Sequence, residues 1–200
     1  MPSTPRKRAL SLLSRRGIVR SRSLEHHGIS RTLLRRLREQ GLIERVGRGL
    51  YSLPGAVLTE RHSLAEASQR VPGGVVCLLS ALRFHGLTTQ NPSEVWMAVN
   101  RKAWRPRPGH PRLRLIYVSS RALQEGVEEH DIGGVKVRVF SAAKTVADCF
   151  KFRNKIGIDV AVEALRDFSR RHRGGATDLA RFARICRVTR VMQPYLDAVA

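Results

Sequence analysis

The stretch Ser30–Leu53, SRTLLRRLREQGLIERVGRGLYSL, has the pattern of one helix followed directly by a two-stranded hairpin. Ser30 is a suitable N-cap for the helix, and Gly41 is a suitable stop after its last turn. Beyond Gly41 the segments LIERV and LYSL are typical of strands. Two glycines, Gly47 and Gly49, lie between these strands, and they allow the positive φ angles that a hairpin turn needs.

The helix and the hairpin are both basic. On a helical wheel the leucines share one face, and these are Leu33, Leu34 and Leu37. A basic stripe on another side of the helix consists of Arg31, Arg35 and Arg38. Arg48 lies at the tip of the hairpin. A basic helix followed by a basic hairpin is typical of a winged helix-turn-helix, with the helix in the major groove and the wing on the backbone or minor groove.

The residues before this stretch complete the same motif. Arg6–Ser14 carries the apolar pattern of a first helix that ends near Gly17. Ser21 is placed to cap a short second helix, and Gly28 supplies the tight turn before the third. We therefore predict a winged helix-turn-helix DNA-binding domain at residues 1–56.

The composition favours a folded protein with a polyanionic partner. Hydrophobic residues make up 42% of the 200 residues, which is sufficient for a core. The formal net charge of +21 exceeds what solubility requires and indicates binding to nucleic acid. A solvated basic surface is the open alternative, because charge alone gives affinity without specificity.

The three cysteines and the hydropathy pattern indicate in which cellular compartment the protein acts. Cys77, Cys149 and Cys186 are widely separated and form no CxxC pair, which argues against a disulfide framework and a structural zinc site. The chain has no apolar run long enough to span a bilayer and no signal-peptide core. We expect a cytoplasmic protein with no metal, no cofactor and no membrane contact.

Residues 57–200 alternate between helical and strand patterns, which predicts an α+β domain. The expected strands are Glu94–Val99, Leu113–Val118, Val127–Ile132 and Val135–Phe140. The run Val75–Gly86 is apolar nearly all round, and we interpret it as a buried helix. The fold class is therefore α+β, an N-terminal winged helix-turn-helix followed by a mixed domain. That domain has a small, mainly antiparallel sheet of about four strands and a helical C-terminal tail.

The segment Arg101–Arg114, RKAWRPRPGHPRLR, is basic and rich in proline, which excludes a helix. One interpretation is a nucleic-acid-contacting loop in which Trp104 stacks on a base. The other is a solvated long hairpin with Trp104 folded back on the sheet. The candidate backbone-contacting residues are Arg101, Lys102, Arg105, Arg107 and Arg112.

Catalytic patterns are weak. Ser141 and Lys144 have the spacing of a Ser-x-x-Lys pair, one helical turn apart. We favour the interpretation of Ser141 as an N-cap with Lys144 solvated, because no base or oxyanion loop accompanies them. Asp148, one turn further on, is placed to pair with Lys144. The chain contains no Walker loop, GxGxxG or HExxH motif, so we predict that it is not an enzyme.

Three longer segments resemble one family. The stretch GISRTLLRRLREQGLIERVGRGLYSLPG resembles the N-terminal winged-helix domain of the AbiEi family of bacterial antitoxins. VVCLLSALRFHGLTTQNPSEVWMAV and IGGVKVRVFSAAKTVADCFKFRNKIGIDVAVEALRDF resemble its C-terminal domain. The similarity runs from about Ala9 to about Phe168, with residues 57–200 as the antitoxin C-terminal domain.

The resemblance implies an antitoxin of a type IV toxin–antitoxin system, which acts in phage defence. Such a protein represses its own operon and counteracts a nucleotidyltransferase-like toxin, without a stable complex between the two. The implied partner is double-stranded operator DNA, bound by a monomer or weak dimer. By position, the implied DNA contacts are Arg31, Thr32, Arg35, Arg38, Arg45 and Arg48.

A second hypothesis comes from the basic proline-rich segment. An RNA-binding or nuclease-associated protein would use Arg101–Arg114, with Trp104 against an unpaired base, as its main contact.

Overall fold

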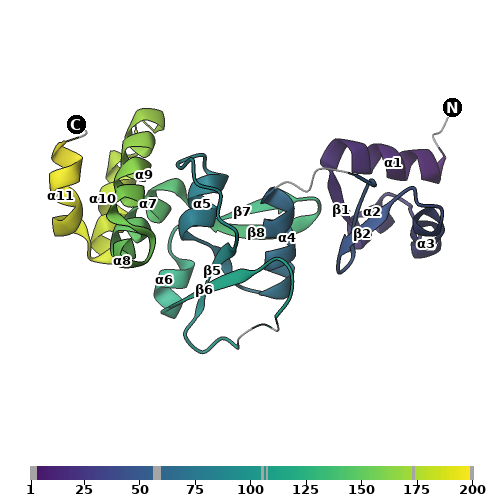
Figure 1. The fold of residues 1–200 in the computed structure, drawn as a ribbon, viewed down its shortest axis with the longest axis horizontal. Coiled ribbons are helices and arrows are strands. Elements are labelled where there is room, and N and C mark those ends of the chain that lie inside the picture. The colour runs from purple at the N-terminus through teal and green to yellow at the C-terminus, as the bar shows by residue number, and fades with distance from the viewer. Residues whose placement is uncertain (1–3, 56–59, 105, 107, 173, 199–200) are drawn as a thin grey trace. The chain divides into compact units, whose positions relative to one another are not determined.

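The computed structural model describes residues 4–55, 60–104, 106, 108–172 and 174–198 (Figure 1). The chain divides into two compact units, Met1–Arg70 with His130–Val137 and Val71–Glu129 with Arg138–Ala200. The domain boundary that the sequence predicts between residues 56 and 57 lies outside the described residues.

The first unit contains the helix-turn-helix and its wing. Its elements are α1 (Pro5–Arg16), β1 (Ile18–Arg20), α2 (Ser21–His26), α3 (Arg31–Glu39), β2 (Glu44–Gly47), β3 (Leu50–Ser52) and α4 (Glu60–Arg70). The three strands form an antiparallel sheet in the order β1-β3-β2. Strand β1 is absent from the sequence prediction, because three residues are too few to show an alternating pattern.

Helix α3 begins and ends where the sequence predicts. The Ser30 hydroxyl accepts a hydrogen bond from the Leu33 amide at 3.2 Å, which caps the helix N-terminus. Gly41 follows the helix with a φ of +68°. Leu34 and Leu37 are buried in a core that also contains Ala9, Leu13, Val19, Leu24, Ile29 and Ile43. The burial of these two leucines turns the arginines of α3 outward.

The wing turn is fixed to the start of α2. Gly49 has a φ of +71°, and its carbonyl accepts a hydrogen bond from the Ser21 amide at 2.8 Å. Of the two glycines, Gly49 has a positive φ and Gly47 does not, since Gly47 lies within β2 and pairs with Leu50. The register shifts between Arg45 and Gly47, so this irregularity, rather than a second left-handed residue, completes the bend.

The second sheet has five strands in the order β6-β5-β4-β8-β7. The strands are β4 (Val75–Val76), β5 (Val95–Asn100), β6 (Leu113–Val118), β7 (Val127–Ile132) and β8 (Val135–Phe140). The predicted fold class is confirmed, with a correction to the strand directions: β4 pairs antiparallel with β5, but β4–β8 and β5–β6 are parallel.

Two physical features explain this correction. Val75 and Val76 belong to a continuous apolar run, whose periodicity does not separate a strand from a buried helix. The helix that follows is shorter than predicted and covers only Leu78–Phe84 (α5). The connection from β5 to β6 is about a dozen residues long, sufficient for a crossover between parallel strands rather than a hairpin.

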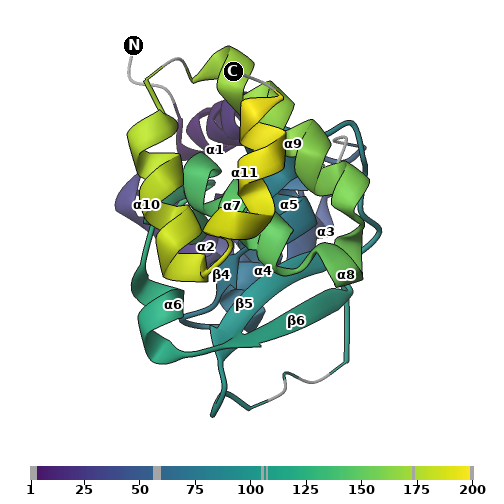
Figure 2. The ribbon, with the colours of Figure 1, turned by 90° about the vertical axis from the view of Figure 1, so that its left-hand side faces the viewer.

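Helix α7 (Ala142–Lys151) is the centre of the helical part of the second unit. The other helices are α6 (Ser120–Gln124), α8 (Arg153–Ile156), α9 (Ile158–Arg171), α10 (Ala176–Cys186) and α11 (Thr189–Asp197). Helix α7 packs against α5, α9 and α10 (Figure 2). Every residue from Ala142 to Phe150 is buried, so this helix is enclosed on all sides, and the predicted helical tail forms its covering.

We expect Leu34→Ala to destabilise the first unit by about 2–5 kcal/mol, because it leaves a cavity among fully buried side chains. The adjacent Arg35→Ala is the matched control. Its side chain is 71% exposed, so its effect should stay within about 0.5 kcal/mol. Urea unfolding followed by circular dichroism measures both variants. Equal stability of the two variants would contradict the assigned orientation of α3.

Candidate nucleic-acid interface

The six residues predicted to contact DNA are all exposed in the structure. Four of them lie on α3, namely Arg31, Thr32, Arg35 and Arg38. Arg45 and Arg48 lie on β2 and at the wing turn. The structure therefore brings them to the surface of one compact unit, on its third helix and its wing. Their contact with DNA stays a prediction.

Acidic neighbours divide these cations into two groups. The Arg31 guanidinium pairs with Glu25, and this hydrogen bond raises the pKa of Arg31. Arg35 Nε lies 3.5 Å from a Glu39 oxygen, a loose pair between two exposed side chains. In the described part of the chain, Arg38 and Arg48 have no ion-pair partner. Among the described residues Arg45 also has no ion-pair partner, but its Nε donates to the Gly47 carbonyl, so Arg38 and Arg48 are the cations most available to phosphate.

Arg36 is an exposed cation of α3 that the sequence interpretation missed. It follows Arg35 directly and precedes the buried Leu37. A signal in the sequence was present, because Arg36 lies outside the leucine face on a helical wheel. Arg36 was missed because the predicted stripe contained only the arginines at positions i, i+4 and i+7. The basic surface of α3 is therefore wider than the predicted stripe.

The proline-rich segment is exposed where it is described. Trp104 is 95% exposed, so the interpretation in which it folds back on the sheet is wrong. Arg101, Lys102 and Arg112 are also exposed. Arg105 and Arg107 lie outside the described residues.

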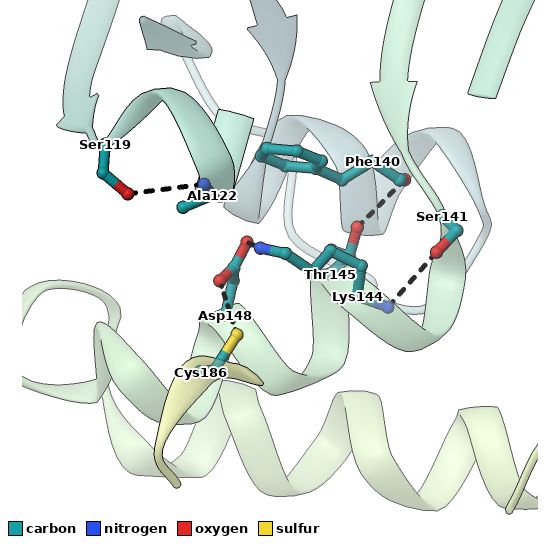
Figure 3. A network of polar contacts seen from close by, with 8 residues as sticks. All are labelled: Ser119, Ala122, Phe140, Ser141, Lys144, Thr145, Asp148 and Cys186. Carbon is teal, nitrogen blue, oxygen red and sulfur yellow. Dashed lines mark hydrogen bonds and ion pairs between the residues drawn. The ribbon is translucent and has the colours of Figure 1, made fainter. Parts of the chain in front are cut away.

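The Ser-x-x-Lys pair is part of a buried polar network (Figure 3). The Ser141 hydroxyl accepts a hydrogen bond from the Lys144 amide at 3.4 Å, so its role as N-cap is confirmed. The expectation of a solvated Lys144 is wrong. Its side chain is only 3% exposed and its ammonium group is paired with Asp148, while the Phe140 ring centroid lies 4.3 Å away. The Cys186 thiol donates to the other Asp148 oxygen at 3.2 Å.

This network has the properties of a structural element. The ammonium group of Lys144 is neutralised by Asp148, and the Ser141 hydroxyl is used as a cap, so neither side chain is arranged as a nucleophile or base. Burial and the charge of Asp148 raise the pKa of Cys186 to about 12. Burial also raises the pKa of Cys77 and Cys149, so all three thiols stay protonated at neutral pH.

Metal-binding groups and membrane-spanning helices are both absent from the described residues. The His, Cys, Asp and Glu side chains described here form no group of three or more that is suited to hold a metal ion. Among the same residues, no helix combines the length and the apolar character needed to cross a membrane.

A comparison with known families finds a match within the first unit. Residues 7–54 match the family described as transcriptional regulators of the AbiEi antitoxin type. The matched segment begins in α1 and ends just after β3, so it contains both α3 and the wing. The family resemblance is confirmed for this segment and supports a DNA-binding antitoxin; for the segments between residues 75 and 168 it stays a prediction. No curated protein matches the chain.

We expect Asp148→Asn to destabilise the second unit by about 3–5 kcal/mol, because it leaves the buried Lys144 ammonium without its counter-charge. Replacing both partners by apolar residues, Lys144→Met with Asp148→Leu, should recover most of that loss, since no buried charge remains unpaired. Urea unfolding of the two variants gives the comparison. A double variant as unstable as Asp148→Asn would show that the ion pair itself, rather than an unpaired charge, determines the stability.

Proposed function

We propose that this chain is a sequence-specific DNA-binding antitoxin that represses its own operon and counteracts a nucleotidyltransferase-like toxin. The observation that carries the proposal is the basic, exposed face of α3 within the segment that matches the AbiEi antitoxin regulators. The wing, which begins and ends within the same segment, supplies a second basic element. The formal charge of +21 provides long-range attraction to DNA.

In the proposed complex, α3 lies in the major groove. Thr32 and Arg35 are placed on its exposed side to meet base edges, and an arginine fork there matches the two acceptors of guanine. The loose pair with Glu39 restricts the Arg35 side chain without neutralising it by close contact. Arg38 borders this surface and is suited to a phosphate contact that fixes the register of the helix, whereas Arg31 would have to exchange its Glu25 partner for the DNA.

The wing would contact the DNA backbone or the minor groove. Arg48 lies at a turn whose Gly49 carbonyl is bound by the Ser21 amide, so the start of α2 fixes the position of the wing tip. Arg45 Nε is 3.2 Å from the Gly47 carbonyl, an interaction that leaves its remaining guanidinium donors available. A fixed cation that meets phosphate adds affinity without sequence preference.

The role of residues 57–200 in the proposal is antitoxicity. A repressor alone does not require the residues beyond the DNA-binding segment that form a five-stranded sheet and the enclosed helix α7. We propose that the protein acts in the cytoplasm as a monomer or weak dimer and needs no stable complex with its toxin.

Arg35→Ala should weaken binding to the operator by about 1–3 kcal/mol and relax the preference at one or two base pairs, because it removes a base-reading fork. Arg48→Ala should weaken operator and random duplex by similar factors, because its contact is with phosphate. Arg184→Ala, an exposed arginine of α10, is the matched control. Titrations of the operator and a scrambled duplex at two salt concentrations measure the effects. If Arg35→Ala lost the same affinity for the operator and for the scrambled duplex, base reading by α3 would be excluded.

The two proposed activities should separate in cells. Arg35→Ala should derepress a reporter placed behind the promoter of the protein's own operon, because the operator is no longer recognised. The same variant should still rescue growth when it is expressed with the cognate toxin, because α3 is not part of the proposed antitoxin region. A reporter that stays repressed would contradict operator recognition by α3. Loss of growth rescue in this folded variant would contradict the assignment of antitoxicity to residues 57–200.

A further inference from the structure

Trp104 is exposed to an extent that is unusual for so large an apolar side chain. Its exposed fraction is 95%, whereas Tyr117, the next most exposed large hydrophobic residue among those described, is at 45%. Trp96, the other tryptophan of the chain, is buried and covered by the Arg114 guanidinium, 4.7 Å from the ring centroid. An indole left in water adds nothing to the core and leaves a π-face free for a ligand.

The backbone that presents Trp104 is anchored to the sheet. Asn100, the last residue of β5, accepts a hydrogen bond from the Lys102 amide on its side-chain oxygen at 2.9 Å. Its carbonyl accepts another from the Ala103 amide at 2.9 Å, and its side-chain amide donates to the Ser120 hydroxyl at 2.7 Å. The chain is thus held in a defined turn up to the residue before Trp104. The loop leaves the β5–β6 side of the sheet, away from α7 (Figure 2).

The surroundings of Trp104 are cationic. No Asp or Glu occurs between Glu94 and Glu125 in the sequence. Arg101, Lys102 and Arg112 are exposed, and in the described part of the chain they have no ion-pair partner. Arg114, by contrast, is 3.6 Å from Glu94 and covers Trp96, so it serves the fold. The exposed indole is therefore accompanied by cations that the fold itself does not use.

We propose that the loop between β5 and β6, which carries Trp104, binds single-stranded nucleic acid. The indole would stack on an unpaired base, and Arg101, Lys102 and Arg112 would contact the flanking phosphates. An unpaired base offers a free π-face, whereas bases inside a duplex are stacked on one another. Tryptophan and arginine are also enriched in protein interfaces, so a protein is the competing occupant of the loop. The run of cations without a carboxylate between Glu94 and Glu125 favours a polyanion instead. This activity goes beyond operator binding and uses residues separate from α3 and the wing.

The test uses the full-length protein and unstructured twelve-nucleotide strands, oligo(U) for RNA and oligo(dT) for DNA. Binding should quench the tryptophan fluorescence of the wild type, because Trp104 stacks on a base while Trp96 is buried. The anisotropy of a fluorescein-labelled strand measures the affinity of the variants that lack Trp104. Trp104→Ala should weaken binding by about 5- to 100-fold, and Trp104→Phe, which keeps an aromatic face, should retain most of the affinity. Arg101→Ala with Lys102→Ala should reduce the salt slope by about 0.7 per lost phosphate contact.

The outcomes identify the ligand and separate this proposal from the DNA-binding one. Binding of both oligo(U) and oligo(dT) would support recognition by base stacking alone. Binding of oligo(U) without oligo(dT) would indicate an additional contact with the 2′-hydroxyl. Arg35→Ala should leave single-strand binding unchanged, and Trp104→Ala should leave the preference for the operator unchanged. Single-strand binding that is equal in wild type and Trp104→Ala would overturn the proposal. Loss of growth rescue from the cognate toxin in Trp104→Ala, with single-strand binding intact, would also overturn it and assign the loop to antitoxicity.

Discussion

The burial of Leu34 and Leu37 is the constraint on which the candidate interface depends. Both leucines are almost completely buried against α1 and α2, and this fixes the rotation of α3 about its axis. Once that rotation is fixed, the arginines of the same helix have only the solvent side available. The charged surface is thus a consequence of core packing, and the Ser30 cap determines where the helix begins.

In the second unit the corresponding element is α7. Its buried face includes a charged pair, Lys144 with Asp148, beside the protonated thiol of Cys186. Such a pair contributes little net stability over an apolar replacement, but loss of one partner is costly. The same burial keeps Lys144 and Asp148 from solvent, so the Ser-x-x-Lys spacing of Ser141 and Lys144 serves helix capping and packing.

Local signals predicted most of the fold, and contacts between distant residues account for the rest. Ser30, Gly41 and the leucine pattern are local, and the structure agrees with them. Strands β1 and β4 have three and two residues, and they exist because partners far along the chain pair with them. The burial of Lys144 and the exposure of Trp104 likewise depend on what surrounds each residue in space, which no pattern in the sequence contains.

The central claim is that α3 and the wing read a particular DNA sequence. The most direct measurement is the sequencing of genomic fragments bound by the full-length protein at physiological salt, where non-specific electrostatic binding is weak. The account predicts strong enrichment of the fragment upstream of the protein's own gene. Uniform enrichment of all fragments would contradict it, because the +21 charge would then act on phosphate alone, with no base recognised.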